Sequence, residues 1–337
     1  MHFLVHERIS VRQMPPCKGG WKQKFHYAFF ILWVIARTLS RRPTWIYASD
    51  LWSCPPAFLL SYIPKIQVIY HEHDSFSSLP TSIFFRFCLW ARRRLARRAG
   101  LCVLPNEQRA AQFAKEAGSN HKVLCVWNCP RQEEISAPRS PKTEESLGVY
   151  YHGNLSPDLF PPTILDAVAK AGKDIRLFIV GYGTRGKEDY IAKLRARSDQ
   201  LGIEERVRFF EPVPRHELWQ IMQNCDAGLA LMPRGTSNSN FRMMVGASNK
   251  PFDYLAGGLA LLVSDLPDWK KTYADPGYGL VCNPDDPQSI AKAFLWLFEH
   301  PGEMRAMGER GRQRILSEWN YEQQFSPVLE RLTNFQR

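Results

Sequence analysis

From Val149 onwards, short apolar runs alternate with segments of helical periodicity, and this alternation limits the possible folds more than any other feature. The apolar runs begin at Val149, Arg176, Val207 and Ala227, and stretches with apolar residues at helical spacing lie between them. Strands that alternate with helices form βαβ units with right-handed crossovers and a parallel sheet. The sequence therefore predicts an α/β fold whose ligand site lies at the carboxyl ends of the strands.

The first part of the chain shows a less regular version of the same alternation. Thr44–Ser49, Ile66–Tyr70 and Leu101–Leu104 are predicted strands that helices separate. Pro130–Gly148 then combines three prolines with many charges and few apolar residues, which is typical of a linker. The chain of 337 residues is thus predicted to form two domains, residues 1–145 and 146–320, followed by a last helix at 321–337.

The stretch Ser248–Asp265 has the pattern of a short helix, a glycine stop and a buried strand. Ser248 or Asn249 is placed to cap the helix, and Lys250 lies in its first turn. A helix start presents free N–H groups that suit a phosphate, so one interpretation is a diphosphate bound by this turn and Lys250. Asp253, one turn further on the same face, would accept hydrogen bonds from a ribose. The alternative is an ordinary βα corner with a solvated Lys–Asp face.

Net charge separates the two parts of the chain. Residues 1–145 hold 21 Lys and Arg against 10 Asp and Glu, whereas residues 146–337 hold 23 of each kind. The whole excess of +11 therefore lies in the first part. Such a basic half predicts an anionic partner, which could be nucleic acid, an anionic bilayer or a phosphorylated acceptor.

Two apolar segments in the basic half bear on that partner. Phe25–Leu39 is strongly apolar but shorter than the roughly 20 residues that cross a bilayer, so a buried or membrane-facing helix is predicted. Ser82–Gly100 predicts a helix with a basic end, which either lies on an anionic membrane or is a core helix with a solvated face. Nucleic acid is not expected, because no recognisable nucleic-acid-binding motif accompanies the aromatic residues. The basic residues that would face the membrane are Arg92, Arg93, Arg94, Arg97 and Arg98.

The cysteines and the chain start indicate a cytoplasmic protein. Eight cysteines are scattered, and the one close pair, Cys125 and Cys129, has no second pair with which to form a zinc site. Reduced core thiols are therefore expected. The first residues include His2, His6 and Glu7, which interrupt any cleavable signal pattern.

Four segments occur in the order and spacing of a known family. The chain resembles the family 4-like retaining glycosyltransferases of GT-B architecture over roughly residues 40–320. That resemblance implies two Rossmann-like domains with parallel sheets facing a cleft, and a C-terminal helix that crosses back to the N-terminal domain. It also implies a nucleotide-sugar donor bound mainly to the C-terminal domain and an acceptor bound to the N-terminal one. The segments are VYYHGNLSPDLF, LFIVGYG, VRFFEPVPRHELWQIMQNCDAGLALMP and SNKPFDYLAGGLALLVSDLP.

The resemblance assigns the donor site residue by residue. Asp253 stands where the family usually has a glutamate that touches the ribose, and Asn249–Lys250 match a family variant that reads Pro-Asn-Lys. Lys250 would neutralise the diphosphate leaving group, the main electrostatic task in breaking the glycosidic bond. Further donor-site positions are Gly153 and Asn154 at one strand-to-helix turn, Gly181 and Gly183 at the next, Glu211, Val213 and Pro214 near the base, and Ser237–Phe241 over the sugar.

The same resemblance places the acceptor at the end of an N-terminal strand. His71–Asp74 would face the cleft, and His73 or Asp74 could accept or orient the acceptor proton. Asp50 ends the neighbouring strand and is a weaker candidate. The alternative is a polar strand end with capping roles.

Three departures from the family pattern are visible. The family's E-x7-E pair is incomplete, because Asp253 fills the second place but Val245 fills the first. LSPDLF after Asn154 carries no basic residue, so Lys250, with Arg234 or Arg242, would supply the charge at the phosphates. The N-terminal domain is also short.

We therefore expect a cytoplasmic glycosyltransferase, peripheral on the inner face of the membrane. It would move a hexose-type sugar from a UDP- or GDP-sugar to a glycan or lipid-linked acceptor, with retention, in assembly of a bacterial surface polysaccharide. No cofactor or metal is expected, because the motifs contain no DxD-like acidic pair. Two alternatives stay open: a nucleotide-sugar 2-epimerase of the same fold, and a non-catalytic GT-B-like binding protein.

Overall fold

The computed structural model describes residues 7–15, 17, 20–75, 82–118, 123–138, 146–183 and 189–334. The chain folds into two compact units, and each is described by itself. The first unit contains most of residues 1–123, and the second contains residues 124–337 with a few earlier ones. The predicted boundary at 145 borders residues 139–145, which lie outside the described residues.

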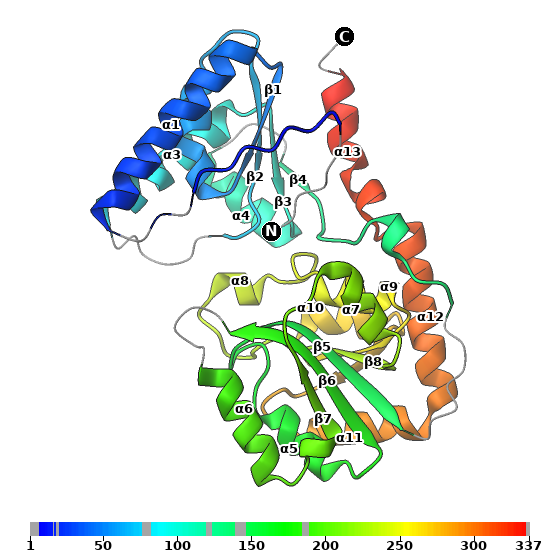
Figure 1. The fold of residues 1–337 in the computed structure, drawn as a ribbon. Coiled ribbons are helices and arrows are strands. Elements are labelled where there is room, and N and C mark those ends of the chain that lie inside the picture. Colours follow the sequence, from blue (N-terminus) through cyan, green and yellow to red (C-terminus); the bar gives the residue numbers. More distant parts are fainter. Residues whose placement is uncertain are drawn as a thin grey trace. The chain divides into compact units, whose positions relative to one another are not determined.

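The first unit is built on a four-stranded sheet in the order β1-β2-β3-β4, with helices beside it (Figure 1). The pairs β1/β2 and β2/β3 are parallel, as the sequence predicted. The short strands β2 and β3 are apolar and almost entirely buried, which is typical of parallel strands with both faces covered. The elements are α1 (Trp21–Arg41), β1 (Trp45–Ser49), η1 (Leu51–Ser53), α2 (Cys54–Leu60), β2 (Gln67–His71), α3 (Ile83–Arg98), β3 (Leu101–Leu104), α4 (Glu107–Ala117) and β4 (Val123–Cys125). Residues 104–109 and 124–125 of these elements and their connections are grouped with the second unit.

The second unit contains a six-stranded sheet in the order β10-β9-β8-β5-β6-β7, and all its pairs are parallel. The strands are β5 (Leu147–Leu155), β6 (Ile175–Gly183), β7 (Val207–Phe210), β8 (Ala227–Ala230), β9 (Ala260–Ser264) and β10 (Gly279–Cys282). Strand order reverses between β5 and β8, and such a reversal leaves a crevice at the carboxyl ends of the strands. The α/β class with parallel sheets is thus confirmed.

Helices cover both faces of this sheet (Figure 1), and each face has its own apolar core. One core packs α5, α6 and α11 against the sheet, and the other packs α7 and α9. The helices and short turns are η2 (Gln132–Glu134), α5 (Thr163–Lys170), α6 (Asp189–Gln200), η3 (Glu204–Arg206), α7 (Arg215–Met222), α8 (Ser239–Arg242), α9 (Lys250–Ala256), α10 (Pro267–Trp269), η4 (Lys270–Ala274), α11 (Pro287–Glu299), α12 (Pro301–Ser317) and α13 (Tyr321–Asn334).

Close packing fixes α9 against the sheet. A Cβ at Gly228 in β8 would lie 2.3 Å from the ring of Tyr254 in α9, so only glycine lets the helix approach this closely. The Tyr254 hydroxyl in turn accepts a hydrogen bond of 3.0 Å from the backbone N–H of His152 in β5. These contacts hold the start of α9 beside the end of β5.

The predicted linker is in part structured. Glu134 in η2 contacts Arg215, and the Ser136 N–H donates to the carbonyl of Ala256, both within the second unit. The described part of the linker is therefore packed onto the domain that follows it. The last helix forms as α13, and its return to the N-terminal domain stays a prediction.

Candidate active site

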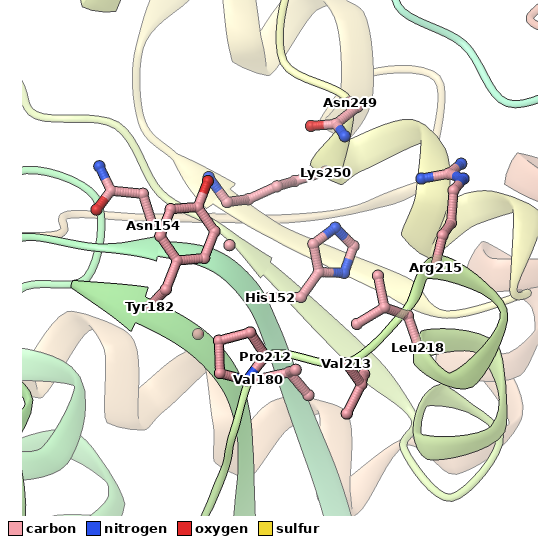
Figure 2. A pocket seen from close by; sticks show the side chains of 12 residues that line it. His152, Asn154, Val180, Tyr182, Pro212, Val213, Arg215, Leu218, Asn249 and Lys250 are labelled. Atoms are coloured by element: carbon pink, nitrogen blue, oxygen red, sulfur yellow. The ribbon is translucent and has the colours of Figure 1, made fainter. Parts of the chain in front are cut away.

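A pocket of about 320 Å³ lies at the carboxyl ends of β5 and β6, on the side where α7 and α9 begin (Figure 2). This is the crevice that the reversal of strand order creates. The sequence had predicted six of its lining residues: Gly153, Asn154, Gly181, Val213, Asn249 and Lys250. The others are His152, Val180, Tyr182, Pro212, Arg215 and Leu218.

Lys250 enters the pocket over a glycine. Gly153 has φ +119°, and a Cβ there would lie 3.1 Å from Cε of Lys250. The backbone conformation therefore favours glycine strongly, and a side chain at this position would in addition crowd the lysine. Gly181 is restricted by packing alone, because a Cβ there would lie 2.6 Å from the side chain of Leu155. Gly183, also predicted for the site, is not among the lining residues.

The ammonium of Lys250 is buried, and in the described part of the chain no carboxylate lies beside it. The residue is 7% exposed, and its Nζ lies 5.3 Å from the ring centroid of Tyr151. Among the described residues no ion pair is formed by Lys250, and burial lowers its pKa to about 8. A buried cation without a counterion favours an anionic ligand, because the ligand would supply the missing charge.

Asp253 is the centre of a charged network behind the pocket. It is 1% exposed, and its carboxylate accepts two hydrogen bonds from Arg215, at 2.7 Å from Nη2 and 3.0 Å from Nη1. Nε2 of His152 lies 3.4 Å from the same carboxylate. Burial alone would raise the pKa of Asp253, but the hydrogen bonds from His152 and Arg215 hold it below its usual value.

Arg215 is shared between two carboxylates. Its guanidinium also contacts Glu134, through Nε to Oε1 and through Nη2 to Oε2 at 3.4 Å. Burial would lower the pKa of Arg215, but Asp253 and Glu134 together hold it above its usual value. The charge of Arg215 is therefore largely neutralised by these two carboxylates. Among the described residues that line the pocket, Lys250 is then the cation without a carboxylate partner.

The contacts of Asp253 bear on its predicted role as a partner of the ribose. The carboxylate does not line the pocket, since Arg215 and His152 occupy its oxygens. Its contact with a ribose stays a prediction, and its observed contacts orient two residues that do line the pocket. Sequence reasoning missed both, although His152 directly precedes Gly153 and Arg215 opens α7 directly after Pro214.

Replacing Asp253 by asparagine is expected to lower stability by about 1–3 kcal/mol, because Arg215 and His152 lose a buried charged acceptor. Chemical denaturation would measure the change. Asp265→Asn is the matched control, since Asp265 pairs with Arg234 at 3.4 Å in a more exposed setting and should change stability by less than about 0.5 kcal/mol. Equal stability of D253N and the wild type would contradict the network's structural role.

The remaining side chains of the pocket are polar at one end and apolar at the other. Asn154 has a buried Oδ1 for which no hydrogen-bond partner exists among the described residues. Tyr182 stands beside it with half of its surface exposed (Figure 2). Val213 and Leu218 supply an apolar side next to Arg215. The pocket thus combines an apolar wall with a polar, cationic end.

Several predicted neighbours lie outside this lining. Glu211, Pro214, Arg234 and Arg242 are not among the lining residues, and Arg234 pairs with Asp265. Residues 237–241 lead into α8, where the side chain of Asn238 accepts a hydrogen bond from the N–H of Asn240. Asn249 occupies the N-cap position of α9 but makes no capping hydrogen bond with its side chain. A role of residues 237–241 over the sugar stays a prediction.

The predicted acceptor residues lie at the carboxyl end of β2 in the first unit. The backbone N–H of His73 donates a 2.8 Å hydrogen bond to Oδ1 of Asp50, and Asp74 is exposed. The ring centroids of His71 and His73 lie 4.0 Å apart. Burial, and to a smaller degree the charge of His73, lowers the pKa of His71 to about 3. His71 is therefore neutral at physiological pH, and the catalytic roles of His73 and Asp74 stay predictions.

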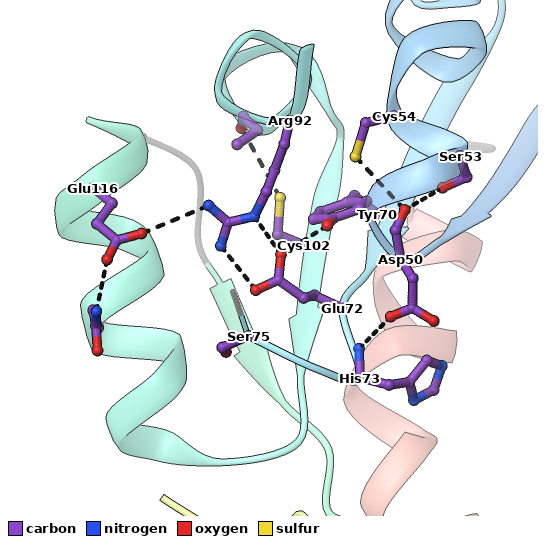
Figure 3. Close-up of polar contacts among 12 residues, drawn as sticks. Asp50, Ser53, Cys54, Tyr70, Glu72, His73, Ser75, Arg92, Cys102 and Glu116 are labelled. Atoms are coloured by element: carbon purple, nitrogen blue, oxygen red, sulfur yellow. Dashed lines mark hydrogen bonds and ion pairs between the residues drawn. The ribbon is translucent and has the colours of Figure 1, made fainter. Parts of the chain in front are cut away.

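Glu72 points the opposite way from His73, into the core (Figure 3). Its carboxylate accepts hydrogen bonds from Nε and Nη2 of Arg92, the latter at 2.8 Å, and from the hydroxyl of Tyr70 at 2.7 Å. Glu72 is fully buried and Arg92 is 6% exposed. The prediction that Arg92 faces a membrane is thus wrong, because Arg92 serves as the buried counterion of Glu72. Arg93, Arg94, Arg97 and Arg98 are exposed.

Neither a metal cluster nor a membrane-spanning helix occurs in the described residues. In these ranges no three His, Cys, Asp or Glu side chains are grouped so that they could hold a metal ion. In the same part of the chain no helix is long and apolar enough to cross a bilayer.

Comparison with known proteins places the chain in a family. A profile of the family described as "Glycosyl transferases group 1" matches residues 131–314, more than half of the chain. A D-inositol 3-phosphate glycosyltransferase from Corynebacterium glutamicum (strain R) is 23% identical over an alignment of 288 positions that covers 80% of this chain. The chain spans 64% of that relative's length, less than two thirds of it.

Solved structures agree on the fold. Anabaena Alr3699/HepE in complex with UDP-glucose has a TM-score of 0.67 and 18% identity, over 90% of this chain and 82% of that one. Sucrose-phosphate synthase from Thermosynechococcus elongatus has a TM-score of 0.68 and 15% identity, over 94% and 80% of the two chains. These likenesses confirm the predicted GT-B fold, and the profile match shows that the chain belongs to the glycosyl transferases group 1 family.

Proposed function

We propose that the protein transfers a sugar from a nucleotide diphosphate sugar, with the donor in the pocket between the ends of β5 and β6 and the start of α9. The observation that carries this proposal is the buried ammonium of Lys250, which has no carboxylate beside it among the described residues. Alr3699/HepE, a structural neighbour, has been solved with UDP-glucose, which supports a donor of this class.

In this proposal the diphosphate contacts Lys250, and the nucleobase lies against Val213 and Leu218 on the apolar side of the pocket. Departure of a nucleoside diphosphate leaves negative charge on the β-phosphate. A cation that is already in place and poorly solvated stabilises that charge more than an exposed one would. Arg215 and His152, held by Asp253, keep the adjoining wall in position.

The finer features are proposed on the family resemblance. They are transfer of a hexose from a UDP- or GDP-sugar, retention of configuration, and a glycan or lipid-linked acceptor oriented by His73 or Asp74. A bacterial surface polysaccharide is the proposed product. The reaction is proposed to need no metal and to occur in the cytoplasm, on an anionic membrane that the exposed arginines of α3 contact.

Donor binding should depend on the protonation of Lys250. Below pH 8 the ammonium is charged in the free protein, and above pH 8 it must take up a proton when the diphosphate binds. Affinity is therefore expected to fall with rising pH, by about tenfold between pH 7 and pH 9. Calorimetry with UDP- and GDP-sugars measures this, and Lys250→Met is the control that should lose the pH dependence. Absence of binding by any nucleotide-sugar would overturn the proposed function.

The 2-epimerase differs from the transferase in what it consumes. An epimerase converts the nucleotide-sugar without an acceptor, whereas the proposed transferase releases the nucleoside diphosphate only when an acceptor or water receives the sugar. A change of the donor's sugar in the absence of acceptor would favour the epimerase.

A further inference from the structure

Helix α1 exposes a stripe of large apolar side chains. Trp21 and Phe25 are each 74% exposed, Phe29 is 60% exposed, Leu32 is 65% exposed and Leu39 is 50% exposed. Their spacing of four, four, three and seven residues places them on one face of the helix. Contiguous apolar surface of this kind is rare in monomeric soluble proteins and marks a site of interaction with a protein or a membrane.

The stripe is not the face that holds α1 in the fold. On another side of the helix the hydroxyl of Tyr27 donates a 2.7 Å hydrogen bond to the carbonyl of Trp52, and its ring lies 5.1 Å from that of Phe84 at the start of α3. Thr38 is also buried. Helix α1 is thus anchored by one face while the apolar stripe stays uncovered.

The charged residues of helices α1, α2 and α3 all have one sign. Helices α1, α2 and α3 contain no Asp or Glu, whereas α1 carries four basic residues and α3 carries six. Nζ of Lys24 lies 4.3 Å from the ring centroid of Trp21, so a cation borders the stripe directly. The four basic residues of α1 are Lys22, Lys24, Arg37 and Arg41.

Helix α3 repeats this combination. It exposes Ile83, Phe87 and Trp90 together with all of its arginines except Arg92. The rings of Phe87 and Trp90 stack with centroids 5.9 Å apart, and the guanidinium of Arg94 lies 5.8 Å from the Trp90 ring. Figure 1 shows α1 and α3 on the same side of the sheet of the first unit.

We propose that the apolar stripe of α1 inserts into an anionic bilayer, with the helix lying in the plane of the interface. The inference rests on the membrane association proposed above. It assigns the surface that enters the bilayer to α1, because an arginine cluster alone provides no apolar surface to embed. Apolar side chains on helices whose charged residues are all basic match the boundary between acyl chains and anionic headgroups. A second copy of the chain fits less well, because it would bring the same unbalanced positive charges together.

The test is sedimentation of the full chain with vesicles of phosphatidylglycerol or of phosphatidylcholine. The double variant Phe25→Glu/Phe29→Glu is expected to bind phosphatidylglycerol vesicles at least about tenfold more weakly than the wild type. Leu329→Glu is the matched control, because Leu329 is a comparably exposed apolar residue on α13 in the second unit. Circular dichroism and donor binding in the second unit check that the variants are folded.

Each outcome decides the proposal. Loss of vesicle binding in F25E/F29E, with binding retained in L329E, supports insertion of the stripe. Binding retained in F25E/F29E but lost in Arg93→Glu/Arg94→Glu leaves membrane association standing and overturns the role of α1. A wild type that ignores phosphatidylglycerol vesicles, or that forms a dimer which F25E/F29E dissociates, also overturns it. None of these results bears on donor binding, which calorimetry measures separately.

Discussion

Replacing Lys250 by methionine is expected to weaken nucleotide-sugar binding by about 1.5–3 kcal/mol, a loss of roughly ten- to 150-fold in affinity, because the diphosphate loses its charged partner. Methionine keeps most of the side-chain volume beside Gly153 and Tyr151, so packing changes little. Calorimetry with the best UDP- or GDP-sugar would measure the loss. An unchanged affinity would refute the role given to Lys250.

The same variant is expected to be more stable than the wild type at neutral pH. Burial lowers the pKa of Lys250 to about 8 from 10.5, so the folded state disfavours the charged form. Below pH 8 the lysine is charged in both states, and the full penalty of about 3 kcal/mol applies. Between pH 8 and 10.5 the folded state loses its proton first, and the penalty fades as the pH rises.

A variant that binds the donor more weakly but is more stable shows that the residue serves ligand binding at the expense of folding stability. The stability gain of K250M should therefore be largest at pH 7 and vanish near pH 10.5, as chemical denaturation at several pH values would show. Lys292→Met, on the exposed surface of α11, is the matched control and should change neither quantity. A K250M variant less stable than the wild type at pH 7 would mean that Lys250 serves the fold instead.

The second large effect is expected at Arg92. Replacing it by methionine leaves the carboxylate of Glu72 buried, with the Tyr70 hydroxyl as its one remaining side-chain partner among the described residues. This loss should cost about 3–5 kcal/mol of stability in the first unit. Amide hydrogen exchange in β2 and β3 reports on this unit specifically. The measurement is thus insensitive to the stability of the second unit.

Two further variants test whether the loss of stability comes from the Arg92–Glu72 ion pair itself. Arg93→Met, at the adjacent exposed position of α3, should change stability by less than about 0.5 kcal/mol. Arg92→Met/Glu72→Gln should recover most of the loss, because it removes both charges and leaves no buried ion. Equal exchange rates in R92M and R93M would show that the buried pair contributes little.

The sequence by itself determined the α/β class, the parallel strands of the second unit and half of the pocket lining. It could do so because strand and helix periodicity is local, and because a helix start with polar residues leaves a pattern of neighbouring residues. Asn249 and Lys250 were accessible in this way, whereas Gly153 and Asn154 were assigned through the family resemblance. The family resemblance then ordered these local patterns along the chain.

Tertiary structure alone decided which charges have partners. Asp253, Arg215 and His152 come from three separate elements, and Glu72 and Arg92 come from two, so no spacing along the chain reveals their contacts. Arg92 and Arg93 are neighbours of the same type, yet one is buried and the other exposed, because a helix turns successive residues to different sides. Burial and pairing depend on what the rest of the chain places opposite a side chain, and only the folded molecule specifies that.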